Sequence, residues 1–121
     1  NDAMQYAVLT AFDEASTYPE EMAKEFQARR DLICSRLNSM PGVSCHIPKG
    51  AFYVFPKVEV PGLNSQELAI ELLKGGVLSS PGSAFGESGE GHLRFAYTVS
   101  REDISLGMDK VESVLKRLRG D

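Results

Sequence analysis

The chain has 121 residues, 42% of them hydrophobic, which is enough for one compact domain with a single core. Its formal net charge is −4, from 17 acidic and 13 basic side chains. Nucleic-acid-binding domains carry a clustered basic surface, so this acidic balance weighs against that class of protein. No apolar run approaches the roughly 20 residues that cross a bilayer. We therefore expect a cytoplasmic protein without nucleic-acid or membrane partners.

Two cysteines, Cys34 and Cys45, are present. Small secreted domains usually carry several disulfides, so we expect two reduced thiols here, with a Cys34–Cys45 disulfide as the alternative. His46 and His92 stand apart from each other and from both thiols. Because no cluster has the spacing of a metal site, we expect no bound metal.

The chain begins Asn1-Asp2-Ala3-Met4 and enters a helical pattern directly, which leads us to expect a piece of a longer protein. Apolar residues recur at three- and four-residue spacing and predict a first short helix that ends before Tyr18-Pro19. The residues of this face are Met4, Val8, Ala11, Phe12 and Ala15.

A second, longer helix is predicted from about residue 18 to residue 39. Thr17, followed three residues later by Glu20, has the pattern of a capping box at its start. Pro41-Gly42 ends it. Its apolar face comprises Met22, Phe26, Ile33 and Leu37.

Short β-rich runs follow this helix. Residues 43–47 and 51–55 predict two strands, and Pro48-Lys49-Gly50 between them predicts a hairpin. A third strand is predicted at residues 77–79 and a fourth at 93–99. In the fourth strand Leu93, Phe95, Tyr97 and Val99 alternate with smaller or polar residues, which places Arg94 on the face opposite the bulky side chains.

Two further helices have clear end signals. Asn64 and Glu67 have the spacing of a capping box, and Gly75-Gly76 ends a helix that we expect to reach Lys74. Ser100 begins the last helix, which continues to Arg119. This order of elements predicts an α+β fold, with a small, mostly antiparallel sheet and helices packed on one face.

Arg94 is the first candidate for chemistry. A guanidinium offers a planar fork of donors that binds a carboxylate through two parallel hydrogen bonds. The neighbouring Ala96 and Thr98 are small enough to leave room for such a ligand. The alternative is a surface arginine in a loose ion pair, which spacing alone favours.

Other reactive groups are weaker candidates. The glycine-rich loop 81–91 lacks the Gly-Lys-Ser/Thr ending of a phosphate cradle, and its two glutamates would repel a phosphate. Serines near His92 lack the Gly-x-Ser-x-Gly elbow of a hydrolase. A Schiff-base lysine needs a desolvated pocket, whereas the pattern predicts that every lysine here faces solvent. We therefore expect no catalytic residue in this chain.

Three motifs in order resemble the C-terminal, or small, domain of class I/II aminotransferases, which are fold-type I enzymes. They are PKGAFYVFP from Pro48 to Pro56, Gly76-Val77 with PGSAFG from Pro81 to Gly86, and LRFAY from Leu93 to Tyr97. The resemblance covers essentially the whole chain. It implies transfer of an amino group between an amino acid (aspartate, aromatic or alanine-like) and a 2-oxo acid, through pyridoxal 5'-phosphate.

The resemblance also implies site residues. Arg94 matches the arginine that binds the α-carboxylate of the amino-acid substrate. Gly50, Ala51 and Phe52 match a segment that moves toward the substrate when the small domain closes, with core packing as the alternative for Phe52. In such enzymes the Schiff-base lysine and the other cofactor-binding residues lie upstream. The resemblance thus implies that this chain is inactive alone and holds no catalytic or cofactor-binding residue.

Three segments follow from the same resemblance. Residues 1–17 match a helix at the edge of the large domain, 18–40 the connecting helix, and 41–121 the core of the small domain. The implied partners are the large domain of the same polypeptide and a second copy in a homodimer. With the large domain absent, we expect the face of Met4, Val8 and Phe12 to be mobile or docked on another copy.

Other functions remain open at this stage. Relatives of similar sequence catalyse lyase or synthase reactions, so the family is better defined than the reaction. The alternative function is a free-standing amino-acid-binding regulatory module that uses Arg94 without catalysis. A purely structural role, without affinity for carboxylates, is a third.

Overall fold

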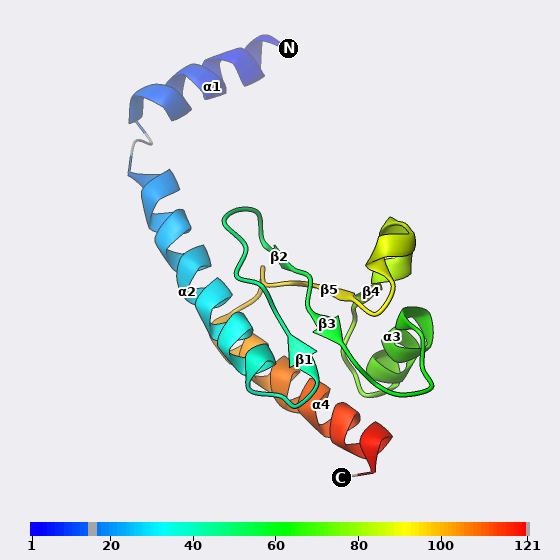
Figure 1. The fold of residues 1–121 in the computed structure, drawn as a ribbon. Helices are drawn as coiled ribbons and strands as arrows, with labels where there is room; N and C mark the ends of the chain where they lie inside the picture. The colour runs from blue at the N-terminus through cyan, green and yellow to red at the C-terminus, as the bar shows by residue number, and fades with distance from the viewer. Residues whose placement is uncertain (15–16, 121) are drawn as a thin grey trace.

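A computed structural model describes residues 1–14 and 17–120 of the chain (Figure 1). Its helices are α1 (Asp2–Glu14), α2 (Tyr18–Asn38), α3 (Ser65–Lys74) and α4 (Arg101–Arg119), with two 3-10 helices, η1 (Gly82–Phe85) and η2 (Glu87–Gly89). Its strands are β1 (Val43–Ser44), β2 (Tyr53–Val54), β3 (Lys57–Val58), β4 (Ser80–Pro81) and β5 (Leu93–Ala96). These elements confirm the predicted α+β class. No helix in this part of the chain is long and apolar enough to span a membrane.

The strands form one three-stranded sheet and one separate pair, and all the pairings are antiparallel. In the three-stranded sheet β5 lies in the centre, in the order β2-β5-β4, with Val54 opposite Phe95 and Ser80 opposite Arg94. The other pair is β1 with β3. A single bridge between Lys57 and His92 connects this pair to the strand region of β5.

The predicted hairpin between residues 43–47 and 51–55 is wrong. β1 pairs with β3, with Val43 opposite Val58, while β2 pairs with β5. Pro48 has no N–H to donate to a ladder, and Ala51 has a positive φ of 60°. The chain therefore makes a wide loop after β1 and pairs with distant segments.

The strand predicted at residues 77–79 is also misplaced, because pairing begins only at Ser80. The Val77 N–H donates to the carbonyl oxygen of Leu72 at 2.9 Å, so this residue still belongs to the end of α3. β5 ends at Ala96, earlier than predicted, and Val99 is 47% exposed instead of facing the core.

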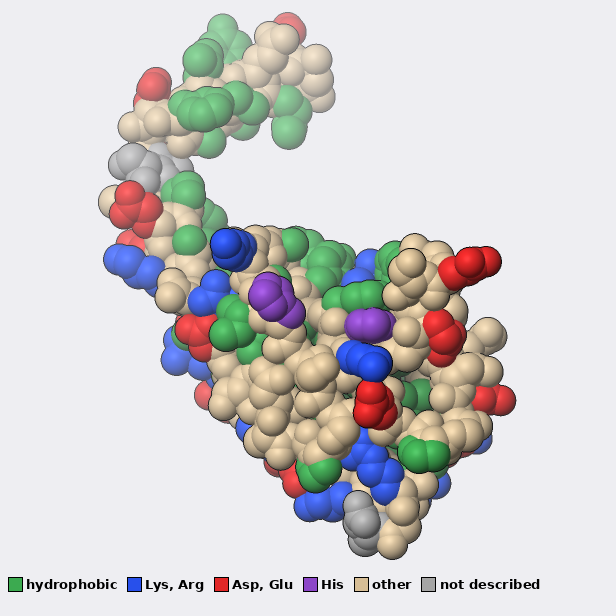
Figure 2. Space-filling view, viewed as in Figure 1, with side chains coloured by type: hydrophobic (Ala, Val, Ile, Leu, Met, Phe, Trp, Pro, Cys, Tyr) green, Lys and Arg blue, Asp and Glu red, His purple; other side chains and the backbone are tan. Residues whose placement is uncertain are grey.

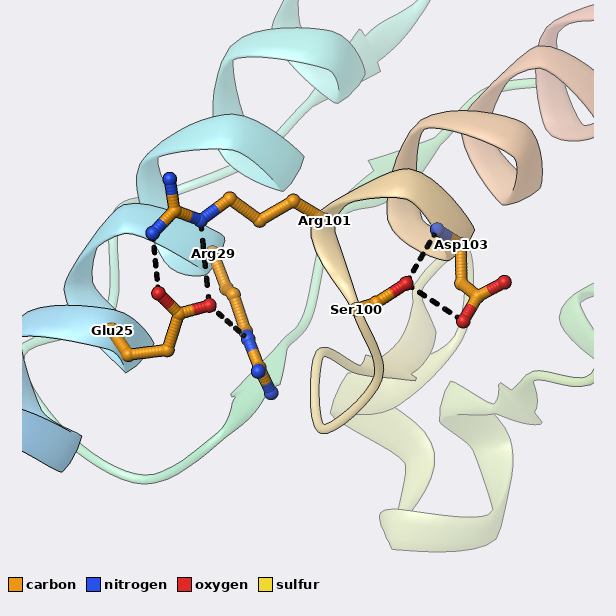
Figure 3. Close-up of polar contacts among 5 residues, drawn as sticks. All are labelled: Glu25, Arg29, Ser100, Arg101 and Asp103. Carbon is orange, nitrogen blue, oxygen red and sulfur yellow. Dashed lines mark hydrogen bonds and ion pairs between the residues drawn. The ribbon is translucent and has the colours of Figure 1, made fainter.

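Two of the three predicted helix caps are confirmed. The Asn64 side chain accepts from the N–H of Glu67 at 2.9 Å, and the Glu67 side chain accepts from the N–H of Asn64 at 3.0 Å. Ser100 Oγ accepts from the N–H of Asp103 at 3.0 Å (Figure 3). The cap predicted at Thr17 is wrong, because Thr17 has helical angles and makes no side-chain cap hydrogen bond. Of the predicted first helix, Ala15 lies outside the described residues.

The core lies between the sheet and the helices α2 and α4, which run alongside each other (Figure 1). Leu93, Phe95 and Tyr97 face this core and are 1%, 4% and 2% exposed. The helices contribute Ile33 and Leu37 from α2, and Ile104, Met108, Val111 and Leu115 from α4. The helices thus cover one face of the sheet, as predicted.

Ion pairs connect α2 to α4. The Glu25 carboxylate accepts from Arg29 Nε at 2.7 Å and is also paired with Arg101 at the start of α4 (Figure 3). Arg36 Nη2 lies 2.6 Å from Asp109 Oδ1 further along the two helices. These contacts orient the two helices that support the sheet.

α1 lies apart from the rest of the chain (Figure 1) and contributes no buried residue. Met4, Leu9 and Phe12 are 62%, 60% and 83% exposed. Figure 2 shows hydrophobic side chains gathered along this projecting helix. Its apolar residues therefore contribute nothing to the core described above.

Candidate functional site

β5 positions Arg94 on the sheet face that turns away from α2 and α4. Its two neighbours, Leu93 and Phe95, are buried in the core, and Arg94 itself is half-buried. Side chains of successive strand residues point to opposite faces, which explains this placement. The predicted orientation of Arg94 is confirmed.

Two aromatic rings contact the Arg94 guanidinium. Its Cζ atom lies 4.4 Å from the ring centroid of Tyr53, on β2, and 4.7 Å from that of Phe85, at the end of η1. Both distances are typical of cation–π contacts. The rings limit how far the guanidinium can move. They occupy none of its N–H donors with a strong hydrogen bond.

Those donors are largely available for a ligand. Arg94 Nη2 donates to Ser80 Oγ at 3.2 Å. Within residues 1–14 and 17–120, the structure pairs Arg94 with no carboxylate, whereas Arg29, Arg36, Arg101 and Arg117 each have at least one. A guanidinium carries five N–H donors, so a carboxylate can still be bound at two of them.

We call the surface formed by Tyr53, Phe55, Phe85, His92 and Arg94 the aromatic face. The Phe55 ring stacks on His92 with centroids 5.1 Å apart, and it meets Phe85 edge-on at 5.8 Å. Phe55 and Phe85 remain 40% and 54% exposed. A positive charge amid half-exposed rings can bind a molecule that has one anionic end and an apolar part.

The structure separates the three residues of the predicted shielding segment. Phe52 is 41% exposed, and its ring lies 4.6 Å from that of Tyr53 and 6.3 Å from that of Phe26. Phe52 therefore reaches the aromatic face through Tyr53. Gly50 and Ala51 instead border a cavity of about 280 Å³ between α2 and this loop.

Phe26, Arg30 and Tyr97 also line this cavity, and Arg94 does not border it. The carbonyl oxygen of Ala51 accepts a hydrogen bond from the buried Tyr97 hydroxyl at 3.0 Å. Tyr97 also donates its backbone N–H to the carbonyl oxygen of Phe52 at 3.0 Å. One core residue thus holds two successive carbonyl groups of the segment.

Sequence reasoning missed Tyr53, Phe85 and Ser80 as contacts of Arg94. Tyr53 and Ser80 reach it through the pairing of β2 and β4 with β5, and that pairing was not predicted. One signal was available: Tyr53 and Phe55 occupy alternate positions of one strand-forming run, which predicts that their side chains lie on the same face of the strand.

The described residues do not fit pyridoxal phosphate by themselves. The six lysines are all exposed: Lys24, Lys49, Lys57, Lys74, Lys110 and Lys116. A lysine that forms a Schiff base needs a desolvated pocket, which none of these positions provides. No group of three or more potential metal ligands occurs in the part of the chain that the structure describes.

Cys34 and Cys45 are free, buried thiols with 3.9 Å between their sulfur atoms. Burial is the main cause that raises the pKa of both thiols, that of Cys45 to about 12. Reactive thiols are accessible and have a low pKa. This pair therefore lacks the properties of a catalytic site.

Comparison with known proteins assigns the chain to a family. The family model described as aminotransferase class I and II matches residues 1–111. The chain belongs to this family. It is 41% identical to aromatic-amino-acid aminotransferase 2 of Thermococcus litoralis and 41% identical to aspartate aminotransferase of Pyrococcus abyssi. Each match covers 93% of this chain and 30% of the relative, so the chain spans about 30% of the length of these relatives.

Solved structures of aminotransferases share the fold. Alanine aminotransferase from Pyrococcus furiosus superposes with a TM-score of 0.87 at 39% identity, over 93% of this chain and 29% of that one. Aspartate aminotransferase from Thermus thermophilus with maleate gives a TM-score of 0.80 at 33% identity, over 92% and 29% of the two chains. The resemblance inferred from the three motifs is thereby confirmed at the level of family and fold.

Proposed function

We propose that this chain is the C-terminal, small domain of a pyridoxal-phosphate-dependent aminotransferase, and that Arg94 binds the α-carboxylate of its substrates. The observation that carries this proposal is the Arg94 guanidinium held between Tyr53 and Phe85 with no carboxylate partner in the described chain. The structural arginines of the domain use their donors within it: Arg101 pairs with Glu25, and Arg119 donates to the carbonyl oxygens of Pro41 and Glu59.

The aromatic face supports the carboxylate assignment chemically. The two neighbouring rings offer no strong hydrogen-bond acceptor, so most of the guanidinium N–H groups stay available, and a planar carboxylate can accept two parallel hydrogen bonds from them. The rings also reduce the water around the pair, which strengthens the attraction between the opposite charges. Arg94 then fixes the end that all amino acids and 2-oxo acids share.

The substrate class is part of the same proposal. We propose an aspartate, aromatic or alanine-like amino donor and a 2-oxo-acid acceptor. The relatives named aromatic-amino-acid, aspartate and alanine aminotransferases support this range. Maleate, which accompanies the Thermus thermophilus enzyme, is a dicarboxylate, and its chemistry agrees with a carboxylate-binding site in the family.

The cofactor and the remaining machinery are assigned to the rest of a longer polypeptide. None of the six lysines here lies in a desolvated pocket, so the proposal assigns the Schiff-base lysine and the other cofactor contacts to residues outside this chain. We propose that residues 1–17 belong to the edge of the large domain, residues 18–40 form the connecting helix, and residues 41–121 form the small-domain core. The exposed apolar residues of α1 then pack on the large domain, and the complete cytoplasmic enzyme is a homodimer.

Phe52 and its two preceding residues have the shielding role in this proposal. Phe52 lies against Tyr53 at the border of the aromatic face, where it can cover a bound substrate. Tyr97 fixes the carbonyl oxygens of Ala51 and Phe52, so the segment moves with the domain core. Closure of the small domain would carry Phe52 toward the substrate and exclude water.

The test uses the longer protein that contains this chain. Arg94→Ala should leave the cofactor absorbance unchanged and lower kcat/KM for the amino acid by about a hundredfold or more, since two charged hydrogen bonds are lost. Arg94→Lys should recover little, because an ammonium cannot form the bidentate pair. Arg117→Ala, which removes an exposed arginine of α4, is the matched control. Normal turnover in Arg94→Ala would exclude the proposed role, and binding without turnover in the unaltered protein would favour the regulatory module instead.

A further inference from the structure

A buried hydroxyl lies beneath the glycine-rich loop that carries Phe85. Ser65, the first residue of α3, is 1% exposed. Its Oγ donates a hydrogen bond to Glu90 Oε2 at 2.9 Å and accepts one from the N–H of Ser83 at 3.3 Å. The Ser83 hydroxyl oxygen lies 3.0 Å from the same Ser65 Oγ. Ser65 therefore connects the two ends of the loop.

Glu90 fixes the direction of these hydrogen bonds. Its Oε1 accepts from the backbone N–H of Ser65 at 2.7 Å and from that of Gly91 at 2.9 Å. The hydrogen bond from the Ser65 N–H is the first cause that lowers the pKa of Glu90, so the group is a carboxylate at neutral pH. A carboxylate only accepts, so the Ser65 hydroxyl must donate to Glu90 and can only accept from Ser83.

The loop has little room to rearrange around this network. A Cβ atom placed on Gly82 would lie 2.0 Å from the carbonyl oxygen of Gly89, and one on Gly89 would lie 2.0 Å from that of Gly82. The backbone N–H of Gly82 also donates to the carbonyl oxygen of His92 at 2.8 Å. The two arms of the loop are thus in direct backbone contact.

Phe85 follows Ser83 by two residues, at the end of η1. The centroid of its ring lies 4.7 Å from Arg94 Cζ and 5.8 Å from the centroid of Phe55. The position of Phe85 therefore determines one of the two aromatic contacts of the guanidinium. The other restraints on Arg94 are the Tyr53 ring and one hydrogen bond to Ser80. A shift of η1 would release the guanidinium on the Phe85 side.

We propose that Ser65 and Glu90 are positioning residues for Arg94, which act by holding Ser83 and hence the Phe85 ring against the guanidinium. This inference rests on the proposed function of Arg94 in binding the α-carboxylate. Ser65 and Glu90 touch no substrate themselves. Their loss should weaken the binding of amino acid and leave the chemical step nearly unchanged.

The experiment compares Glu90→Gln, Ser65→Ala and Phe85→Leu in the longer protein with bound cofactor. Each should raise KM for the amino acid by about tenfold and change kcat by less than about twofold, since a misplaced guanidinium loses part of a charged pair. Glu87→Gln is the matched control, because this exposed loop glutamate has no hydrogen bond or ion pair from its side chain within the described residues. Its KM should equal that of the unaltered protein.

Double variants separate positioning from general loosening. In the Arg94→Ala background, Glu90→Gln should produce no further rise in KM, because the group that it positions is gone. A further tenfold rise there would overturn the proposal, as would a KM for Glu90→Gln equal to that of Glu87→Gln.

If Glu90→Gln does not fold, Ser83→Ala provides a second test, because it keeps the Ser65–Glu90 hydrogen bond. It should still raise KM by about threefold, and an unchanged KM would overturn the proposal. Normal turnover in Arg94→Ala would instead exclude the proposed function itself.

Discussion

The phenolic hydroxyl of Tyr97 donates a hydrogen bond to the carbonyl oxygen of Ala51, with 3.0 Å between the two oxygens. Tyr97 is 2% exposed and lies in the core, whereas Ala51 belongs to the loop before β2. A side chain of the core thus reaches a backbone atom of the proposed shielding segment. The segment is held by hydrogen bonds more than by its own burial.

Tyr97→Phe tests this link because it keeps the ring and removes the donor. We expect the free energy of unfolding to fall by about 1 kcal/mol, the usual net contribution of one hydrogen bond. Hydrogen exchange of the amides near Ala51 should also accelerate. Urea denaturation measures the first effect. Tyr18→Phe, at a 61% exposed position, should change neither quantity, and an equal loss in both variants would contradict the assignment.

Ala51→Gly tests the backbone of the same segment. Ala51 has a φ of 60°, a region that costs a residue with a Cβ about 1–2 kcal/mol, while glycine loses about 0.5–1 kcal/mol of backbone entropy on folding. We expect the variant to be more stable than the unaltered chain by about 0.5 kcal/mol. In contrast, Ala28→Gly within α2 should cost about 1 kcal/mol. Thermal or urea unfolding that shows a similar loss for both would exclude this backbone conformation.

The Glu25 cluster predicts a pH dependence of stability. Hydrogen bonds from Arg101 and then Arg29 lower the pKa of Glu25 from its usual 4.5 to about 2. A lowered pKa in the folded state means that the ion pairs stabilise the fold above pH 4.5 and that this contribution is lost as the pH falls from 4.5 to about 2. Arg101 is exposed and Glu25 and Arg29 are partly exposed, so added salt should weaken the effect.

Urea denaturation of the unaltered chain and of Glu25→Gln across pH 2 to 7 measures this contribution. The difference in unfolding free energy should be largest at neutral pH and should vanish near pH 2. A constant difference for Glu25→Gln at every pH would show that the ion pairs do not form.

The two thiols should be inert in the folded protein. Burial raises the pKa of Cys34, and it raises that of Cys45 to about 12, so little thiolate is present at pH 8. We expect iodoacetamide to leave both thiols unmodified in native buffer and to alkylate both in urea, as read by mass spectrometry. Modification of the native protein at the rate of a free thiol would contradict the observed burial.

The sequence predicted local structure well where its signals act within a few residues. The capping box at Asn64 and the cap at Ser100 were confirmed, because each depends on one side chain and a nearby N–H. Alternation along β5 also placed Arg94 on the correct face. The cap at Thr17 was wrong, since Pro19 lies in the first turn of α2 and Thr17 itself has helical angles.

Strand pairing could not be read from the same local signals. β1, β2 and β3 follow one another in the chain, yet β1 pairs with β3 while β2 pairs with β5, some 40 residues away. A hairpin between neighbouring runs was the simplest expectation, and no turn signal excluded it. The contacts of Arg94 with Tyr53 and Ser80 depend on these long-range pairings, so they became visible only in the structure.

The mutual approach of Gly82 and Gly89 has a consequence for how the loop can evolve and move. Neither position tolerates even an alanine unless the backbone separates, because a methyl group on either would overlap the opposite carbonyl oxygen. The backbone segments around Gly82 and Gly89 therefore move together. A backbone movement of η1 that displaces Phe85 from the guanidinium would therefore also displace the end of η2.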